Sequence, residues 1–173
     1  MKIFGLAGWS GSGKTTLMVR LLPALIARGV SVSTMKHAHH AFDIDRPGKD
    51  SYEHRAAGAT EVMISSNARW ALMHELRGGP EATVEQLIKH MTPVDLLMIE
   101  GFKSHAHPKL EVHRAALGKP LLCADDPHVV AIASDVPIPS VRLPRFALDD
   151  AEGIADFIIG HCGLARPRVA SAG

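Results

Sequence analysis

The chain has 173 residues, of which 46% are hydrophobic and 21% charged, and its formal net charge is +1. This length predicts a single domain with one core, and no polybasic run supports nucleic-acid binding by counterion release. No apolar stretch approaches the roughly 18 residues of a membrane helix, and no signal-peptide pattern follows Met1. Cys123 and Cys162 form no metal or disulfide pattern, which predicts a protein of the reducing cytoplasm.

Short apolar runs of strand length alternate with longer segments of helical periodicity along the chain. This alternation predicts an α/β fold with a mostly parallel central sheet flanked by helices. In chain order we predict strands at 2–7, 30–35, 61–65, 70–75, 94–100, 110–113, 121–123 and 129–133, and helices at 15–28, 51–57, 82–90 and 149–161. The runs 61–65 and 70–75 are expected to pair as an antiparallel extension. Residues 1–163 are assigned to one nucleotide-binding domain and 164–173 to a frayed tail.

A glycine-rich loop, GWSGSGKTT at residues 8–16, separates the first strand from the first helix. Gly8, Gly13, Lys14 and Thr15 match the phosphate-loop pattern G-x-x-x-x-G-K-[ST], in which backbone N–H groups cradle phosphates. In that pattern the lysine reaches the β- and γ-phosphates and the hydroxyl of the next residue ligates Mg²⁺. The alternative is an ordinary glycine and serine turn. A strand before the loop and a helix after it favour the P-loop NTPase fold.

An acidic residue ends the most apolar strand, VDLLMIEG at residues 94–101. P-loop proteins place a carboxylate beside Mg²⁺ at such a strand end, so Glu100 is the predicted partner of Thr15. The alternative is an exposed carboxylate with no ligand. Lys103, two residues after Gly101, is either a phosphate contact or a solvated charge.

The segment KHAHHAFDIDRPGKDS, residues 36–51, concentrates histidines and charges after the second strand. One interpretation is a segment that senses the γ-phosphate, in which Asp43 or Asp45 orients water or holds the water shell of the metal. A second interpretation is a transition-metal site of His39, His40 and an aspartate. A third is a solvated polar loop whose charges neutralise one another.

A candidate base reader lies at the end of VVAIASD, residues 129–135. The common guanine signature [NT]-K-x-D is absent. The Asp135 carboxylate could accept hydrogen bonds from guanine N1–H and N2–H, a donor pair that adenine lacks. Alternatively, Asp135 only begins the turn that contains Pro137.

The whole pattern resembles the MobB family, small P-loop GTP-binding proteins that act as molybdopterin-guanine dinucleotide biosynthesis adapters. The resemblance rests on GWSGSGKTTL, KHAHHAFDIDRPGKDSYEHRAAGA, RWALMHE, LLMIEGFK and HVVAIASDVP. It implies a cytoplasmic homodimer with a mixed sheet that binds GTP with Mg²⁺ and hydrolyses it slowly. The implied partner is the molybdopterin guanylyltransferase, which joins GMP to molybdopterin.

Carried onto this sequence, the resemblance implies a nucleotide site built from several segments. Thr15 and Glu100 would lie near Mg²⁺, and Asp135 would read guanine. The residues predicted to act in hydrolysis are Lys14, Asp43, Asp45 and Glu100, and those predicted to bind nucleotide are Gly11, Ser12, Gly13, Lys14, Thr15, Thr16 and Asp135.

Two functions of other classes compete with the GTP-binding adapter. A small-metabolite kinase would use the same loop and needs an arginine-rich lid, for which the candidates are Arg142 and Arg145, the only closely spaced pair with Leu-Pro between them. A scaffold that binds the phosphate of molybdopterin would stack the pterin on Trp9 or Trp70, although Trp70 is favoured as a core or dimer-interface residue. The sequence lacks a glutamine after Glu100 to position the attacking water, which favours slow hydrolysis. Arg46 or Arg55 is either an arginine finger that stabilises the transition state of hydrolysis or an ordinary surface charge.

Overall fold

A computed structural model describes residues 1–38, 42–102 and 105–164. The chain divides into two compact units, a first unit of Met1–His37 with Thr92–Gly173 and a second unit of Ala38–Met91. The second unit is therefore inserted into the sequence of the first. The assignment of residues 1–163 to one domain stays a prediction.

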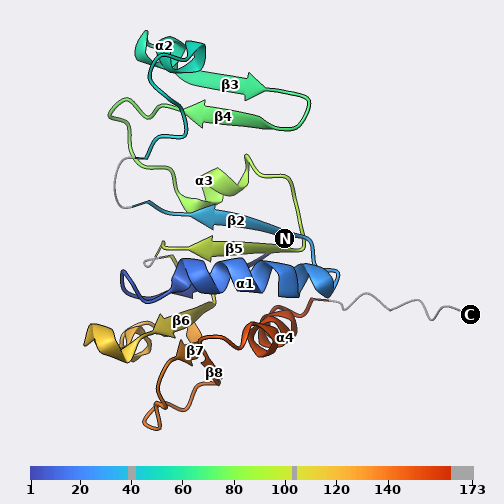
Figure 1. Cartoon of the computed structure of the whole chain (residues 1–173), viewed down its shortest axis with the longest axis vertical. Coiled ribbons are helices and arrows are strands. Elements are labelled where there is room, and N and C mark those ends of the chain that lie inside the picture. The colour runs from blue at the N-terminus through green and yellow to red at the C-terminus, as the bar shows by residue number, and fades with distance from the viewer. Residues whose placement is uncertain (39–41, 103–104, 165–173) are drawn as a thin grey trace, which may run out of the picture. The chain divides into compact units, whose positions relative to one another are not determined.

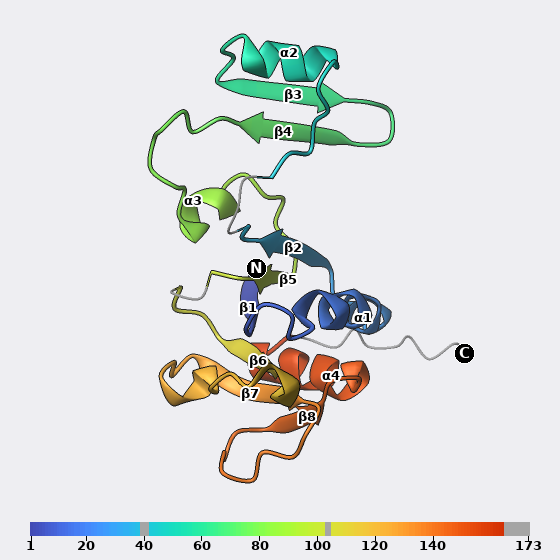
Figure 2. The same ribbon diagram turned by 60° about the vertical axis from the view of Figure 1, so that its left-hand side comes forward.

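The first unit is built on a six-stranded sheet with the order β2-β5-β1-β6-β7-β8 (Figures 1 and 2). All of its neighbouring strands pair in parallel. Its strands are β1 (Lys2–Ala7), β2 (Val32–Lys36), β5 (Leu96–Glu100), β6 (Lys109–His113), β7 (Val129–Ser134) and β8 (Arg145–Ala147). Because the strands are parallel, their carboxyl ends share one edge of the sheet, where ligands bind in open α/β sheets.

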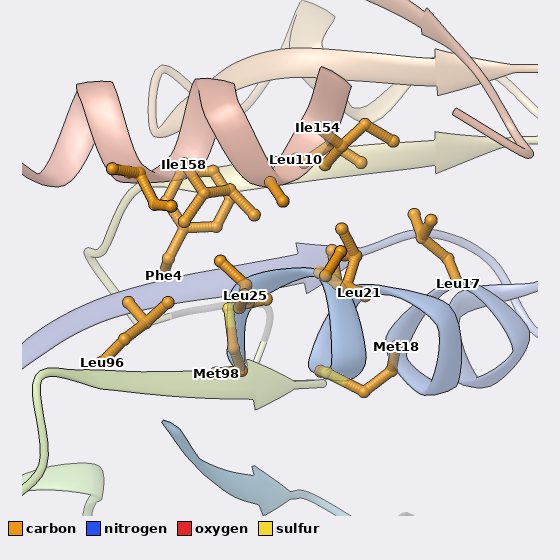
Figure 3. Close-up of a cluster of buried hydrophobic side chains, with 14 of the residues drawn as sticks. Phe4, Leu17, Met18, Leu21, Leu25, Leu96, Met98, Leu110, Ile154 and Ile158 are labelled. Atoms are coloured by element: carbon orange, nitrogen blue, oxygen red, sulfur yellow. The ribbon is translucent and has the colours of Figure 1, made fainter. Parts of the chain in front are cut away.

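Helices α1 (Lys14–Ala27) and α4 (Ala151–Cys162) pack against one face of this sheet around a continuous apolar core. Figure 3 shows side chains of α1, α4 and β1 converging in it, among them Leu21, Ile158 and Phe4. These three side chains are fully buried. Each such side chain contributes about 1.5–3 kcal/mol by leaving water, so this core fixes the position of β1 and α1 on either side of the glycine-rich loop.

An arginine clamp joins α1 to α4 at the surface of the core. The Arg28 guanidinium donates to Glu152 at 2.6 Å and to Asp156 at 3.0 and 3.1 Å, and also to the Ala24 carbonyl at 2.9 Å. Hydrogen bonds to these two carboxylates raise the pKa of Arg28 above its ordinary value. Arg28 therefore has a structural role, because its hydrogen bonds hold α1 and α4 together.

The second unit consists of α2 (Asp50–Ala56), the hairpin β3 (Glu61–Ser65) and β4 (Trp70–His74), and the short α3 (Val84–Ile88). The hairpin is antiparallel, as predicted. Val62 and Met73 are opposite each other and buried, whereas Met63 and Trp70 on the other face are 63% and 62% exposed. The hairpin thus has one packed face and one exposed apolar face, and Trp70 is not a core residue.

The structure corrects one predicted element. Residues 121–123 were expected to form a strand, but Leu122–Ala124 form a 3₁₀ helix. The buried Glu111 carboxylate accepts hydrogen bonds from the backbone N–H groups of Leu122 and Cys123, at 2.7 and 2.9 Å. A side chain therefore satisfies backbone groups that a strand would have paired with a neighbouring strand.

The other predicted elements are present, with ends that differ by a few residues. Strand β8 was not predicted because it has only three residues. Asp150 caps α4 by accepting from the Gly153 N–H. Of the predicted frayed tail, only Leu164 lies within the described residues. In the described part of the chain, none of the helices has the length and apolar character needed to cross a bilayer.

Candidate functional site

The glycine-rich loop joins β1 to α1 at the carboxyl edge of the first unit's sheet. Gly8 and Gly13 have φ values of 151° and 102°, a region that side chains disfavour. A Cβ on Gly8 would lie 2.5 Å from the Val112 carbonyl oxygen, so the loop also needs glycine there for close packing. Helix α1 begins at Lys14, and its N-cap residue Gly13 supplies no side-chain cap, which leaves the first N–H groups of the helix to face a ligand.

Lys14 folds back over the glycine-rich loop. Its ammonium group donates to the carbonyl oxygens of Gly8 and Trp9, at 3.0 and 3.1 Å. These contacts keep the positive charge next to the loop's N–H groups, where the phosphates of a nucleotide would lie in a phosphate loop. The loop and Lys14 therefore combine backbone donors with a cation at one place, as an anion site requires.

Ser12 is a buried polar residue within the loop. It is 1% exposed, and its Oγ has no hydrogen-bond partner among the described residues. An unsatisfied buried hydroxyl costs about 1–3 kcal/mol, so Ser12 fits a loop that hydrogen-bonds a ligand. Thr16 is exposed in the first turn of α1, and Gly11 takes a φ of 80° between Ser10 and Ser12.

Thr15 and Glu100 meet across two elements of the first unit. The Thr15 hydroxyl lies 3.0 and 3.2 Å from the two carboxylate oxygens of Glu100. The arrangement follows from topology, because β5 pairs with β1 and both strands end at the edge where α1 begins. The Lys36 ammonium is 3.9 Å from Glu100, at the limit of an ion pair. Glu100 is only 12% exposed, and within the part of the chain that the structure describes Lys36 is its only cation within 4 Å.

This donor pair fits Mg²⁺. A hydroxyl and a carboxylate are the hard oxygen ligands that Mg²⁺ takes, usually with one or two protein groups, the rest coming from water and phosphate. No cluster of three His, Cys, Asp or Glu side chains exists within residues 1–38, 42–102 and 105–164. The predicted transition-metal site falls on His39 and His40, which lie outside the described residues, as does Lys103.

Asp135 follows β7, two strands from β1 in the same sheet. Its Oδ1 accepts a hydrogen bond from the Ala115 N–H at 2.9 Å. Asp135 also lines a pocket of about 520 Å³, together with Ser134, Ile138 and Phe146 among others. A carboxylate has about four acceptor positions, so one hydrogen bond leaves Asp135 able to accept more. The position therefore fits a group that reads hydrogen-bond donors of a base.

The second unit holds Asp43 and Asp45 in a local network. Arg55 donates to both carboxylate oxygens of Asp43 at 2.9 Å, and these hydrogen bonds lower the pKa of Asp43. Arg55 also contacts Glu75 at 3.3 Å. Asp45 accepts from Ser51 at 2.9 Å. Asp43 and Arg55 are therefore paired with each other, and the roles predicted for Asp43 and Asp45 in hydrolysis stay predictions.

Sequence reasoning missed a segment that lies along the glycine-rich loop, residues 114–120, which we call the loop-side segment. The Trp9 indole N–H donates to the Pro120 carbonyl at 2.9 Å. A Cβ on Gly11 would lie 3.7 Å from Leu117, and a Cβ on Gly13 would lie 3.5 Å from the Arg114 guanidinium. The only signal for this segment was its place after strand β6, because it contains no known motif.

These features define the class of protein. A mostly parallel sheet with a glycine-rich loop after β1, a hydroxyl and carboxylate pair beside it, and a small antiparallel sheet form a P-loop NTPase fold, as predicted. The chain belongs to the family of molybdopterin guanine dinucleotide synthesis protein B (MobB), whose model matches residues 3–135.

Individual relatives agree with this assignment. The chain is 42% identical to the molybdopterin-guanine dinucleotide biosynthesis adapter protein of Escherichia coli K12 over 91% of both chains. It is 39% identical to the adapter protein of Haemophilus influenzae, over 90% of this chain and 86% of that protein. A crystal structure of molybdopterin-guanine biosynthesis protein B matches with a TM-score of 0.73 at 25% identity, covering 92% of this chain and 99% of the other. The family resemblance of the sequence is thereby confirmed.

Proposed function

We propose that this chain binds GTP together with Mg²⁺, hydrolyses it slowly, and serves as an adapter in molybdenum cofactor biosynthesis. The nucleotide part rests on one observation, the approach of the Thr15 hydroxyl to both oxygens of Glu100 beside the glycine-rich loop. The adapter part rests on family membership and on the names of the relatives from E. coli and H. influenzae. The partner enzyme would be a molybdopterin guanylyltransferase, and direct contact with molybdopterin is not part of the proposal.

Each group at the site has a distinct task in this proposal. The loop's N–H groups and Lys14 would bind the phosphates, and Asp135 would select guanine over adenine. Thr15 and Glu100 would hold Mg²⁺, which when bound neutralises charge on the phosphate oxygens. This division of tasks requires no movement of Thr15 toward Glu100, because the two already lie within hydrogen-bond distance.

We expect slow hydrolysis because two groups that fast GTPases use, a water-positioning glutamine after Glu100 and an available arginine finger at Arg55, are not provided. No glutamine follows Glu100 to orient the attacking water. Arg55, one candidate for an arginine finger, is bound by Asp43 and Glu75. Because Asp43 is held by Arg55, Asp45 is the acidic residue of the segment 36–51 that we expect to affect turnover. GTP binding rather than rapid turnover would then be the main property of the protein.

The proposed homodimer would use the exposed face of the β3–β4 hairpin. Met63 and Trp70 lie on that face, and large exposed apolar patches commonly mark interfaces between proteins. Sedimentation of a Trp70→Glu variant should give the mass of a monomer. Val19→Glu, which charges an equally exposed apolar position on α1, should leave the dimer intact. If the Trp70→Glu variant is still a dimer, the dimer contact does not use this face of the hairpin.

A cytoplasmic location completes the proposal. Cys123 and Cys162 are both free, as expected in a reducing compartment. Burial, together with the neighbouring Glu111 carboxylate, raises the pKa of the Cys123 thiol, and burial raises that of Cys162. Both thiols therefore stay protonated and weakly reactive at neutral pH.

Calorimetric titration tests the nucleotide part. GTP, GDP, GMP and ATP are titrated into the full chain, with Mg²⁺ and with a chelator. We expect tighter binding of GTP than of ATP and a loss of GTP affinity when Mg²⁺ is removed. Equal affinity for ATP would contradict the role of Asp135, and affinity independent of Mg²⁺ would contradict the role of the Thr15 and Glu100 pair.

A further inference from the structure

Arg114 lies between the two ends of the proposed nucleotide site. It directly follows β6, the strand that separates β1 with its glycine-rich loop from β7 with Asp135. Because all three strands are parallel, their carboxyl ends lie in sequence along the same edge. A residue at the end of the middle strand is therefore positioned between the loop and Asp135.

The Arg114 guanidinium approaches both neighbours. One of its nitrogens, Nη2, lies 3.5 Å from where a Cβ on Gly13 would be, and Gly13 is the N-cap residue of α1. The other, Nη1, lies 3.8 Å from the Asp135 Oδ2. One planar group thus reaches from the start of α1 to the candidate base reader.

Comparison with two structural arginines, Arg28 and Arg55, shows that Arg114 is held by no comparable contact. Arg28 and Arg55 are 21% and 19% exposed and form hydrogen bonds of 2.6 to 3.3 Å with carboxylates. The Arg114 side chain is 44% exposed, and its contact with Asp135 is too long for a hydrogen bond. Within the described residues its guanidinium forms no hydrogen bond. Ion pairs of this exposed kind contribute about 0–1 kcal/mol, so fold stability does not require it.

We propose that Arg114 binds the α-phosphate of the nucleotide, an inference that rests on the proposed GTP binding. A nucleotide runs from base through ribose and α-phosphate to the β- and γ-phosphates. With the base at Asp135 and Lys14 on the β- and γ-phosphates, the group that faces Arg114 is the ribose and α-phosphate. A guanidinium presents parallel N–H donors that match two phosphate oxygens.

Binding at the phosphate would also affect Asp135. The Arg114 guanidinium would exchange its long contact with Asp135 for a phosphate, and the Oδ2 of Asp135 would become available to the base. Asp135 would keep the hydrogen bond from the Ala115 N–H, which orients its carboxylate. Arg114 therefore links phosphate binding to base reading through a single side chain.

Titrations of Arg114→Ala and Arg114→Lys with GTP, GDP, GMP and ATP test the inference, with Arg20→Ala, an exposed arginine on α1, as the matched control. Loss of charge-assisted hydrogen bonds should weaken GTP, GDP and GMP alike, by about tenfold or more. Arg114→Lys keeps the charge but not the paired donors, so it should recover only part of the affinity. Thermal unfolding without nucleotide should match that of the wild type.

The outcomes separate this inference from the proposed function. If the wild type binds no guanine nucleotide, the proposed function fails. If the wild type binds GTP and Arg114→Ala binds it as well as Arg20→Ala does, only the role of Arg114 fails. A loss confined to GTP would assign Arg114 to the γ-phosphate, and a loss of GTP-over-ATP preference at unchanged GTP affinity would assign it to the base. Either result overturns the α-phosphate contact.

Discussion

The acidic groups of the two units are in opposite electrostatic situations. In the first unit, Glu100 is 12% exposed beside the Thr15 hydroxyl, and its nearest cation among the described residues, Lys36, is 3.9 Å away. In the second unit, Asp43 receives two hydrogen bonds of 2.9 Å from Arg55. Both carboxylates follow from the sequence as site candidates, yet only Glu100 keeps a negative charge available for an ion. A carboxylate is therefore a better candidate ligand when its own fold has not already neutralised it.

The largest effect is expected for Lys14→Ala, which removes the cation of the first unit's site. Loss of charge-assisted hydrogen bonds to two phosphates should weaken GTP binding by about a hundredfold or more. Titration calorimetry and a GTPase assay measure the loss, with Lys89→Ala as an exposed lysine control. Unchanged turnover in Lys14→Ala would mean that a contaminant hydrolyses the GTP.

Glu100→Gln tests the first half of the comparison directly. The amide is nearly isosteric but neutral, so we expect the Mg²⁺-dependent part of GTP affinity to fall by about tenfold to a hundredfold. Stability should change little, because Lys36, the only cation within 4 Å among the described residues, is exposed and already 3.9 Å away. Titrations with and without Mg²⁺, together with thermal unfolding, provide the measurements. A clear loss of stability with unchanged affinity would show that Glu100 is structural.

Asp135→Asn sharpens the comparison at the other end of the site. An amide has one acceptor oxygen in place of a carboxylate's two, so the preference for GTP over ATP should fall by about tenfold. Phosphate binding should persist, and Asp149→Asn, an exposed aspartate of the same unit, is the control. Loss of all nucleotide binding would argue that Asp135 holds the loop-side segment in place through Ala115 and reads no base.

Asp43→Asn tests the second half of the comparison. Removal of the charge leaves Arg55 without its bidentate partner, so we expect a small decrease in the Tm and no change in Mg²⁺-dependent GTP affinity. Circular dichroism during heating and the same titrations measure both quantities. If GTP affinity falls as much as in Glu100→Gln, the contrast between the two carboxylates is wrong.

The smallest expected effect is the pH dependence of the stability that the Asp43–Arg55 pair contributes. Arg55 lowers the pKa of Asp43 in the folded state, so the unfolded chain binds more protons as the pH falls. The stabilisation is complete above the ordinary pKa of 3.8 and declines as the pH falls from there through the folded value. Urea unfolding at pH 5 and pH 3 should show a smaller pH-dependent loss in Asp43→Asn than in the wild type.

The sequence determines the site well where topology and a local motif act together. Thr15 and Glu100 could be paired in advance because a phosphate loop and an acidic strand end share one edge of a parallel sheet. The bidentate pairing of Asp43 with Arg55 was not predictable, because it depends on how α2 packs in the second unit. The same holds for Glu111, which holds Leu122 and Cys123 in a 3₁₀ helix, and for Arg114, which belongs to no motif.

The Arg28 clamp also has a consequence for the order in which the chain folds. Its partners Glu152 and Asp156 lie 124 and 128 residues further along the chain, in the last helix. The core of the first unit therefore cannot be completed until α4 has been synthesised, although the glycine-rich loop is synthesised near the start. The second unit is continuous in sequence and closes mostly short-range contacts, so we expect it to fold earlier, on the ribosome. The nucleotide site would then be among the last parts of the protein to form.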